Sequence, residues 1–193
     1  MAKVQVERKA TNRVYIHNDL QNGARYFLEI IQATQNDPSA EGIFFDCLAC
    51  MTMLAFAFEA CLNFVGDKAV NNWDERLRFK KKINRVFNQL GMKYDASQRP
   101  YSSIETLKEF RDTVAHGKPL IEQVEESFET TPDQIHKHPG VRGPWEEWCQ
   151  PQTVFETYDD VDQIWKLMLE GAGIHYYDTL TSTEGTLTVI DQV

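Results

Sequence analysis

A long apolar segment between residues 39 and 65 places the strongest constraint on the fold. Its apolar positions cover nearly the whole circumference of a helix, at Phe44, Leu48, Met51, Leu54, Ala55, Phe58 and Leu62. A helix that is apolar on all sides lies at the centre of a bundle or is shared with a partner chain. Because Thr52, Glu59 and Asn63 interrupt the run, we expect a core helix and no membrane span.

Amphipathic segments on either side predict the helices that cover this core. The apolar spacing indicates helices over 19–34, 73–90, 102–115 and 158–171. Residues that start or stop helices mark the boundaries. Pro38 or Ser39 would begin the central helix, and Gly66 would end it. Gly91 would end the helix over 73–90. Ser102 or Ser103 would cap the helix over 102–115, and Gly117 with Pro119 would stop it.

The pattern predicts an all-α protein, a helical bundle of four to five helices with an irregular C-terminal extension. We expect an N-terminal arm over 1–18, the bundle over 19–120, and an acidic extension over 121–193 packed on the bundle. Alternating Val4 and Val6 in the arm could form a short strand, and β-prone residues around Glu184-Gly185 could form a small hairpin.

Charge is distributed unevenly along the 193 residues. The chain carries a formal net charge of −9, yet residues 68–118 hold twelve lysines and arginines against six carboxylates, and residues 119–193 hold three against fifteen. A local positive field can attract a polyanion despite an acidic total. Four cysteines without a secretory leader favour free thiols in the cytoplasm.

An arginine and a histidine, Arg111 and His116, lie in this basic segment near the expected end of a helix. A guanidinium can hold a phosphate by two parallel hydrogen bonds, and an imidazole can move a proton near neutral pH. On a continuous helix, side chains five positions apart point about 140° away from each other. The pair can therefore meet only if Gly117 and Pro119 end the helix at His116.

The run from Glu109 to Pro119, with Asp112 directly after the arginine, resembles the Arg-x4-6-His signature of the HEPN superfamily (higher eukaryotes and prokaryotes nucleotide-binding domains). The apolar segment that contains Glu59 and Asn63 also looks like the earlier bundle helix of such proteins, in which a Glu and an Asn interrupt an apolar face. The resemblance covers roughly residues 20–120. It implies a metal-independent endoribonuclease without cofactors, acting on RNA and leaving 2′,3′-cyclic phosphate ends.

Within this resemblance Arg111 would stabilise the phosphate and His116 would transfer protons, with Asp112, Glu59 and Asn63 as supporting residues. One imidazole per chain is few for a reaction that needs an acid and a base, and the family meets this by dimerisation, so a homodimer is implied. The resemblance also implies a toxin or phage-defence role, with an antitoxin or nucleotidyltransferase partner. RNA would be held by basic residues of the same segment, namely Arg76, Lys80, Lys81, Arg85 and Lys118.

Each of these interpretations has a structural alternative. Arg111 could form an ion pair with Glu109, Asp112 or another neighbour while His116 caps a helix, and the protein would then be a non-catalytic helical homodimer that binds protein or nucleotide. Glu59 could orient Arg111 or make an ordinary hydrogen bond between helices. The basic cluster from Arg76 to Arg85 could equally be a solvated helix face.

Two further groups of residues carry weaker signals. Cys47 and Cys50 form a Cys-x-x-Cys pair, but they lie in the most apolar helix, so we interpret them with Cys61 as core residues. His136 and His138 in a loop could chelate a metal, although structural zinc usually needs four ligands at recognisable spacing. We predict no metal site.

Overall fold

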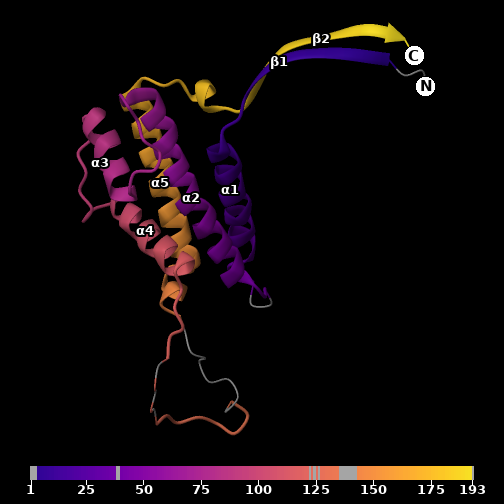
Figure 1. Cartoon of the computed structure of the whole chain (residues 1–193). Coiled ribbons are helices and arrows are strands. Elements are labelled where there is room, and N and C mark those ends of the chain that lie inside the picture. The colour runs from indigo at the N-terminus through magenta and orange to yellow at the C-terminus, as the bar shows by residue number, and fades with distance from the viewer. Residues whose placement is uncertain are drawn as a thin grey trace.

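The computed structural model describes residues 4–37, 40–121, 123, 125, 127–134 and 143–192. These residues form five α-helices arranged as a bundle, with a two-stranded antiparallel sheet that projects from one end (Figure 1). The predicted helical fold is therefore confirmed. The expected break at Pro38 and Ser39 lies outside the described residues.

Helix α2 (Ile43–Ala69) is the central helix and contributes twelve buried residues to the core. Helices α1 (Ile16–Thr34), α3 (Phe79–Gln89), α4 (Ser102–Ala115) and α5 (Pro151–Ala172) pack around it. By length and composition α2 could also cross a membrane, as can the core helix of a soluble protein, and 56% of its most apolar window is buried inside the bundle.

Several predicted helix boundaries need correction. Helix α2 begins after Gly42, whose φ of 92° is incompatible with an α-helix, and it continues past Gly66 to Ala69. Gly66 is a helical residue that leaves room for the Trp73 ring, since a Cβ there would lie 2.4 Å from ring atoms. Helix α3 begins at Phe79, six residues later than Trp73. Gly91 does follow the end of α3, with a φ of +65°.

Helix α5 belongs to the same hydrophobic core as the other four helices. It begins at Pro151, before the expected Tyr158, and its residues Val154, Ile164 and Met168 are fully buried. Buried Asp160 accepts hydrogen bonds from Arg99 and from the Ser103 hydroxyl. Ser103 thus links α4 to α5 instead of capping α4, whose first residue is Ser102.

The sheet pairs the two ends of the chain. Strands β1 (Val4–Arg13) and β2 (Ser182–Gln192) run antiparallel, with a bulge between Gln5 and Val6. Both β-prone segments are strands, as their sequences indicate, but Glu184 and Gly185 lie within β2, opposite Thr11 and Ala10. They form no turn, because the partner of β2 comes from the opposite end of the sequence.

Candidate functional site

Arg111 lies in the last turns of α4 and is held on three sides. Its guanidinium donates hydrogen bonds to Glu59 of α2 and to Asp112, the second with a 3.0 Å distance from Nη2 to Oδ1. It also stacks over the Phe79 ring of α3, 5.0 Å from the ring centroid. The side chain is 21% exposed, and residues of three helices fix its position.

Glu59 carries more than one role in this network. Its second carboxylate oxygen accepts a hydrogen bond of 2.6 Å from Nζ of Lys82, which is only 3% exposed. The contact between half-buried Glu59 and Arg111 is the one that the sequence suggested. Lys82 belongs to the basic cluster from Arg76 to Arg85, and its burial shows that this cluster is not wholly a solvated helix face.

Asp112 completes the cluster from the solvent side. It accepts hydrogen bonds from Arg111 and from Lys108, whose Nζ lies 3.1 Å from Oδ2. Partial burial tends to raise the pKa of Asp112, but the hydrogen bonds from Lys108 and Arg111 outweigh it and hold that pKa below its usual value. Asp112 is therefore an anion at neutral pH and keeps the arginine in place.

His116 is the C-cap of α4, where the sequence placed the end of the helix. Its backbone N–H still donates to the Asp112 carbonyl at 3.1 Å, and its side chain is exposed. Among the described residues, no hydrogen bond or ion pair holds the imidazole. The backbone leaves the helical conformation at His116, with φ −116° and ψ 22°, and within the described residues the imidazole makes no hydrogen bond to Arg111.

Asn63, the other expected supporting residue, lies one turn beyond Glu59. Its Oδ1 atom is buried and has no hydrogen-bond partner within the described residues. The structure therefore joins Glu59, Asp112, Lys82 and Arg111 in one network and leaves Asn63 outside it. Lys82 stands three positions after Phe79 and four before Val86, so the helical repeat could have identified it as the inward lysine.

The expected RNA-binding residues divide into open and engaged cations. Arg76, Lys81 and Lys118 are exposed. Lys80 pairs with Glu105 at 3.2 Å, and Arg85 donates to the Asn71 and Asn72 carbonyls and lies over the Trp73 ring. Arg76 lies 3.8 Å from the Glu75 carboxylate, whereas Lys81 and Lys118 have no ion pair among the described residues, so these two lysines are the better phosphate contacts.

The described members of the other candidate groups form no metal or redox site. The described cysteines are all free and buried, and burial raises the pKa of Cys47 and of Cys50 to about 12. This confirms that the Cys-x-x-Cys pair belongs to the core. No group of three His, Cys, Asp or Glu residues within the described residues could hold a metal ion. His136 and His138 lie outside that part of the chain.

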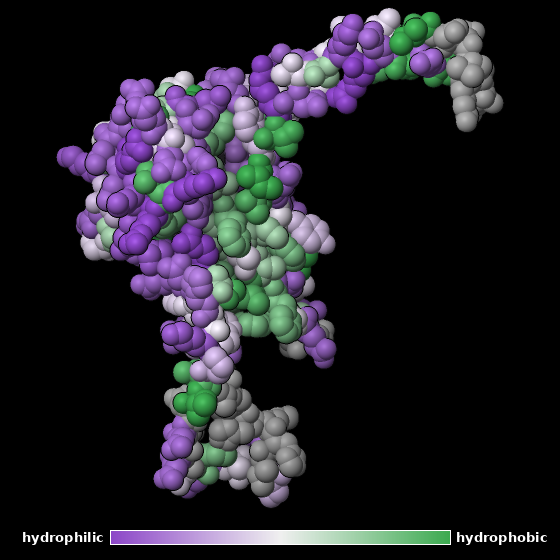
Figure 2. Space-filling view, viewed as in Figure 1, coloured by the Kyte–Doolittle hydropathy of each residue, from purple (hydrophilic) through white to green (hydrophobic). Residues whose placement is uncertain are grey.

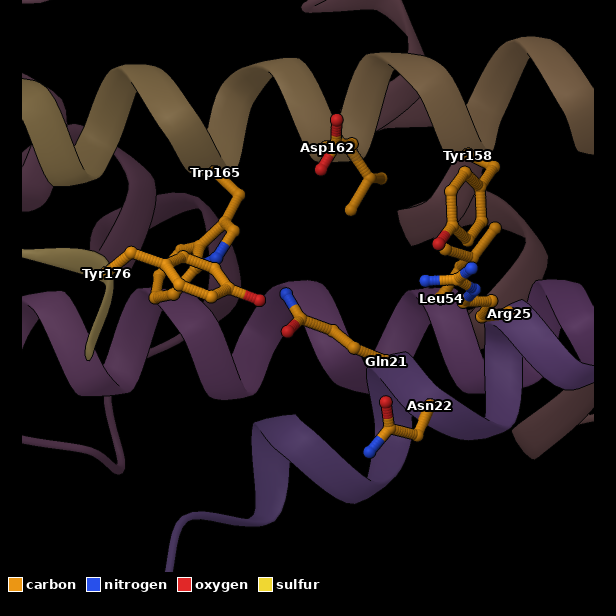
Figure 3. A pocket seen from close by; sticks show the side chains of 9 residues that line it. Gln21, Asn22, Arg25, Leu54, Tyr158, Asp162, Trp165 and Tyr176 are labelled. Atoms are coloured by element: carbon orange, nitrogen blue, oxygen red, sulfur yellow. The ribbon is translucent and has the colours of Figure 1, made fainter. Parts of the chain in front are cut away.

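A cleft of about 180 Å³ lies between α1, α5 and the segment after α5. Trp165 and Tyr176 stand at one end and Tyr158 and Arg25 at the other, with Gln21 between them (Figure 3). Trp165 is 3% exposed and packs the C-terminal helix on the bundle, as expected for the aromatic residues of this region. Arg25 is already paired with Glu29 at 2.9 Å, so the cleft offers no open cation for a phosphate.

Comparisons of the chain with protein-family models, with curated proteins and with solved structures found no match.

Proposed function

We propose that this protein is a metal-independent endoribonuclease of HEPN type, with the catalytic groups at the end of α4. The observation that carries the proposal is the fixed Arg111 guanidinium in the last turns of α4, five positions before an exposed His116 whose imidazole has no hydrogen bond or ion pair among the described residues. Phosphodiester cleavage in the absence of a metal needs a cation for the phosphate and a group that transfers protons, and these are the chemistries of the two side chains.

Arg111 keeps capacity for a phosphate despite its ion pairs. A guanidinium has five N–H donors. In Arg111, three of these N–H groups donate hydrogen bonds to Glu59 and Asp112. The other two N–H groups, one on each terminal nitrogen, have no acceptor among the described residues. Glu59 and Asp112 act as positioning residues, because they orient the planar guanidinium. Their negative charges also offset part of the positive charge that Arg111 presents to a phosphate.

The reaction follows from these two groups and the substrate itself. Neutral His116 takes the proton of the RNA 2′-hydroxyl, and that oxygen attacks the adjacent phosphorus. Arg111 stabilises the added negative charge on the phosphate oxygens. The bond to the 5′-oxygen breaks, a protonated imidazole donates a proton to that oxygen, and a 2′,3′-cyclic phosphate remains. No external oxidant, metal or cofactor enters the balance.

A second chain supplies the second imidazole. One His116 cannot be the base and the acid in the same turnover unless the proton is carried across the phosphate. Exposed Arg76, Lys81 and Lys118 would guide RNA toward this end of the bundle, in a cytoplasmic protein controlled by an antitoxin or a nucleotidyltransferase.

The test is RNA cleavage in EDTA, with analysis of the product ends. We expect 2′,3′-cyclic phosphates from the wild type and a loss of at least about 100-fold in rate for His116→Ala, the usual range for a general acid or base. His175→Ala removes another exposed histidine and is expected to leave cleavage unchanged. Full activity of His116→Ala would overturn the mechanism.

A non-catalytic helical homodimer that binds protein or nucleotide is the second candidate function. The network itself favours a structural role for Arg111, since the guanidinium is held by two carboxylates that also bind buried Lys82 and Lys108. Arg111→Lys separates the two functions. Lysine keeps the charge and loses the planar fork, so a ribonuclease would lose most of its rate while a structural ion pair would be largely retained in thermal unfolding.

A further inference from the structure

The two-stranded sheet formed by β1 and β2 has two chemically different faces. Residues directly opposite each other in an antiparallel pair point to the same side, and neighbours along a strand alternate. One face carries Val6 opposite Val189 and Arg8 opposite Leu187, and the other carries Glu7 opposite Thr188 and Lys9 opposite Thr186. The first face ends in an apolar tip. Its members are 42–73% exposed and comprise Val4, Val6, Leu187, Val189 and, at the bulge, Ile190.

No other described residue of the chain covers this apolar tip, because the sheet points away from the helices (Figure 1). The base of the sheet is held at the start of α1, where the Tyr15 backbone N–H donates to the Thr181 hydroxyl at 3.1 Å and His17 and Asn18 both bond to the Thr179 carbonyl. An isolated two-stranded sheet is marginal in water, so burial of the tip against another surface would stabilise it.

The bundle presents an apolar surface of matching size on α1 and α2. Tyr26, Phe45 and Phe56 are 62%, 68% and 47% exposed, and the surface over these helices is pale to green beside the polar surface over α3 and α4 (Figure 2). A ten-residue strand spans about 33 Å, and the nineteen residues of α1 span about 28 Å. One sheet can thus lie along the length of one such surface.

Charge also matches between the two surfaces. Arg8 is the only charged side chain on the apolar face of the sheet. On the bundle, Asp46 lies next to Phe45, and neither Asp46 nor exposed Glu41 has an ion-pair partner among the described residues. A cation at the inner end of the apolar tip would meet carboxylates at the edge of the α1–α2 surface.

We propose that the β1–β2 sheet docks by its apolar face on the α1–α2 surface of a second copy of this chain, and that the second copy does the same in return. Both complementary surfaces are present on one chain, and they lie apart in its structure (Figure 1). A reciprocal exchange with two-fold symmetry satisfies both at once and closes the assembly as a dimer. The proposal stands on these surfaces alone and does not depend on ribonuclease activity.

The first experiment measures mass in solution by light scattering during gel filtration. We expect the wild type to have twice the 22.3 kDa mass of one chain, and the double variant Leu187→Asp, Val189→Asp to have the mass of one chain. Its matched control, Thr186→Asp with Thr188→Asp, adds the same charge to the opposite face of the same strand and is expected to remain dimeric. Far-UV circular dichroism should show unchanged helix content in all three proteins.

A second experiment identifies the surface that the sheet contacts. Copies with Leu187→Cys are mixed with copies with Phe45→Cys, and we expect a disulfide between the two kinds of chain, since the four native cysteines are buried. Cross-linking confined to Leu187→Cys pairs would mean that sheets contact each other and would overturn the proposal. A monomeric wild type, a dimeric aspartate variant or a monomeric control would also overturn it. Loss of RNA cleavage alone leaves these masses unaffected, so the two proposals fail separately.

Discussion

Arg111 and Lys82 are neighbouring cations that differ in burial. Lys82 is almost fully buried and needs Glu59 as its counter-charge, since an unpaired buried ammonium is costly. Arg111 shares that carboxylate but is 21% exposed. A residue's partners, more than its type, therefore decide whether its charge remains available to a ligand.

The cysteines should be inert in the folded protein. Burial raises the pKa of Cys47 and Cys50 to about 12 and that of Cys149 to about 11, and it also raises the pKa of Cys61. Because the thiolate is the reactive form, we expect almost no reaction with a disulfide reagent at pH 8, and reaction of all four thiols in denaturant. A Thr186→Cys variant, exposed on β2, provides the fast-reacting control. If any native thiol of the folded protein reacted with the reagent as fast as Thr186→Cys does, that thiol would not be buried.

His17 should make the protein less stable in mild acid. Burial lowers its pKa, although the bond to the Thr179 carbonyl works in the opposite direction. The unfolded chain then takes up a proton below about pH 6.5 that folded His17 does not, so its contribution to stability is complete above that pH and is lost as pH falls. Denaturant unfolding at pH 7.5 and 5.5 measures the difference.

The matched variants for this pH dependence are His17→Gln and His175→Gln. Glutamine keeps an N–H donor but does not titrate, so we expect His17→Gln to lose less stability than the wild type between the two pH values. His175 is exposed, and its variant should follow the wild type. An identical pH dependence in all three proteins would exclude His17 as the source.

Among the elements, α2 and α4 show which structural features local sequence patterns can predict. The apolar circumference of residues 39–65 predicted a central helix, and Gly117 with Pro119 predicted the end of α4 at His116, because both depend on neighbours within a few residues. The burial of Lys82 depends on Glu59, 23 positions away, and the pairing of Arg13 with Glu184 joins residues 171 positions apart. Composition and periodicity contain no information about such partners.

Gly66 offers a test of packing between α2 and the segment that follows it. A methyl group at this position would lie 2.4 Å from atoms of the Trp73 ring, so we expect Gly66→Ala to destabilise the protein by about 1–3 kcal/mol in urea unfolding. The control is Gly23→Ala in α1, where the nearest atom, 3.3 Å away, belongs to the flexible Met53 side chain. Alanine favours a helix there by up to about 1 kcal/mol. Equal stability of the two variants would contradict the close contact.

At the scale of the whole molecule, the sheet formed by the two chain ends and the helical bundle contribute separately to stability. The sheet joins the ends outside the core. Helix α5 lies on the C-terminal side of the expected boundary at residue 120, yet it shares one core with α1–α4. Stability of the body should therefore depend on α5 and only weakly on the sheet.

Two truncated chains test this division. The chain 14–181 lacks both strands and keeps the five helices, so we expect native helix content and one cooperative thermal transition. The chain 14–120 lacks α5 and with it six buried apolar side chains, at Val154, Val161, Ile164, Trp165, Met168 and Leu169. Each contributes roughly 1.5–3 kcal/mol, and their sum is comparable to the total stability of about 5–15 kcal/mol of a domain. We therefore expect 14–120 to bind a hydrophobic dye and to unfold without a cooperative transition, whereas a sharp transition in that chain would mean that the first four helices form an independent domain.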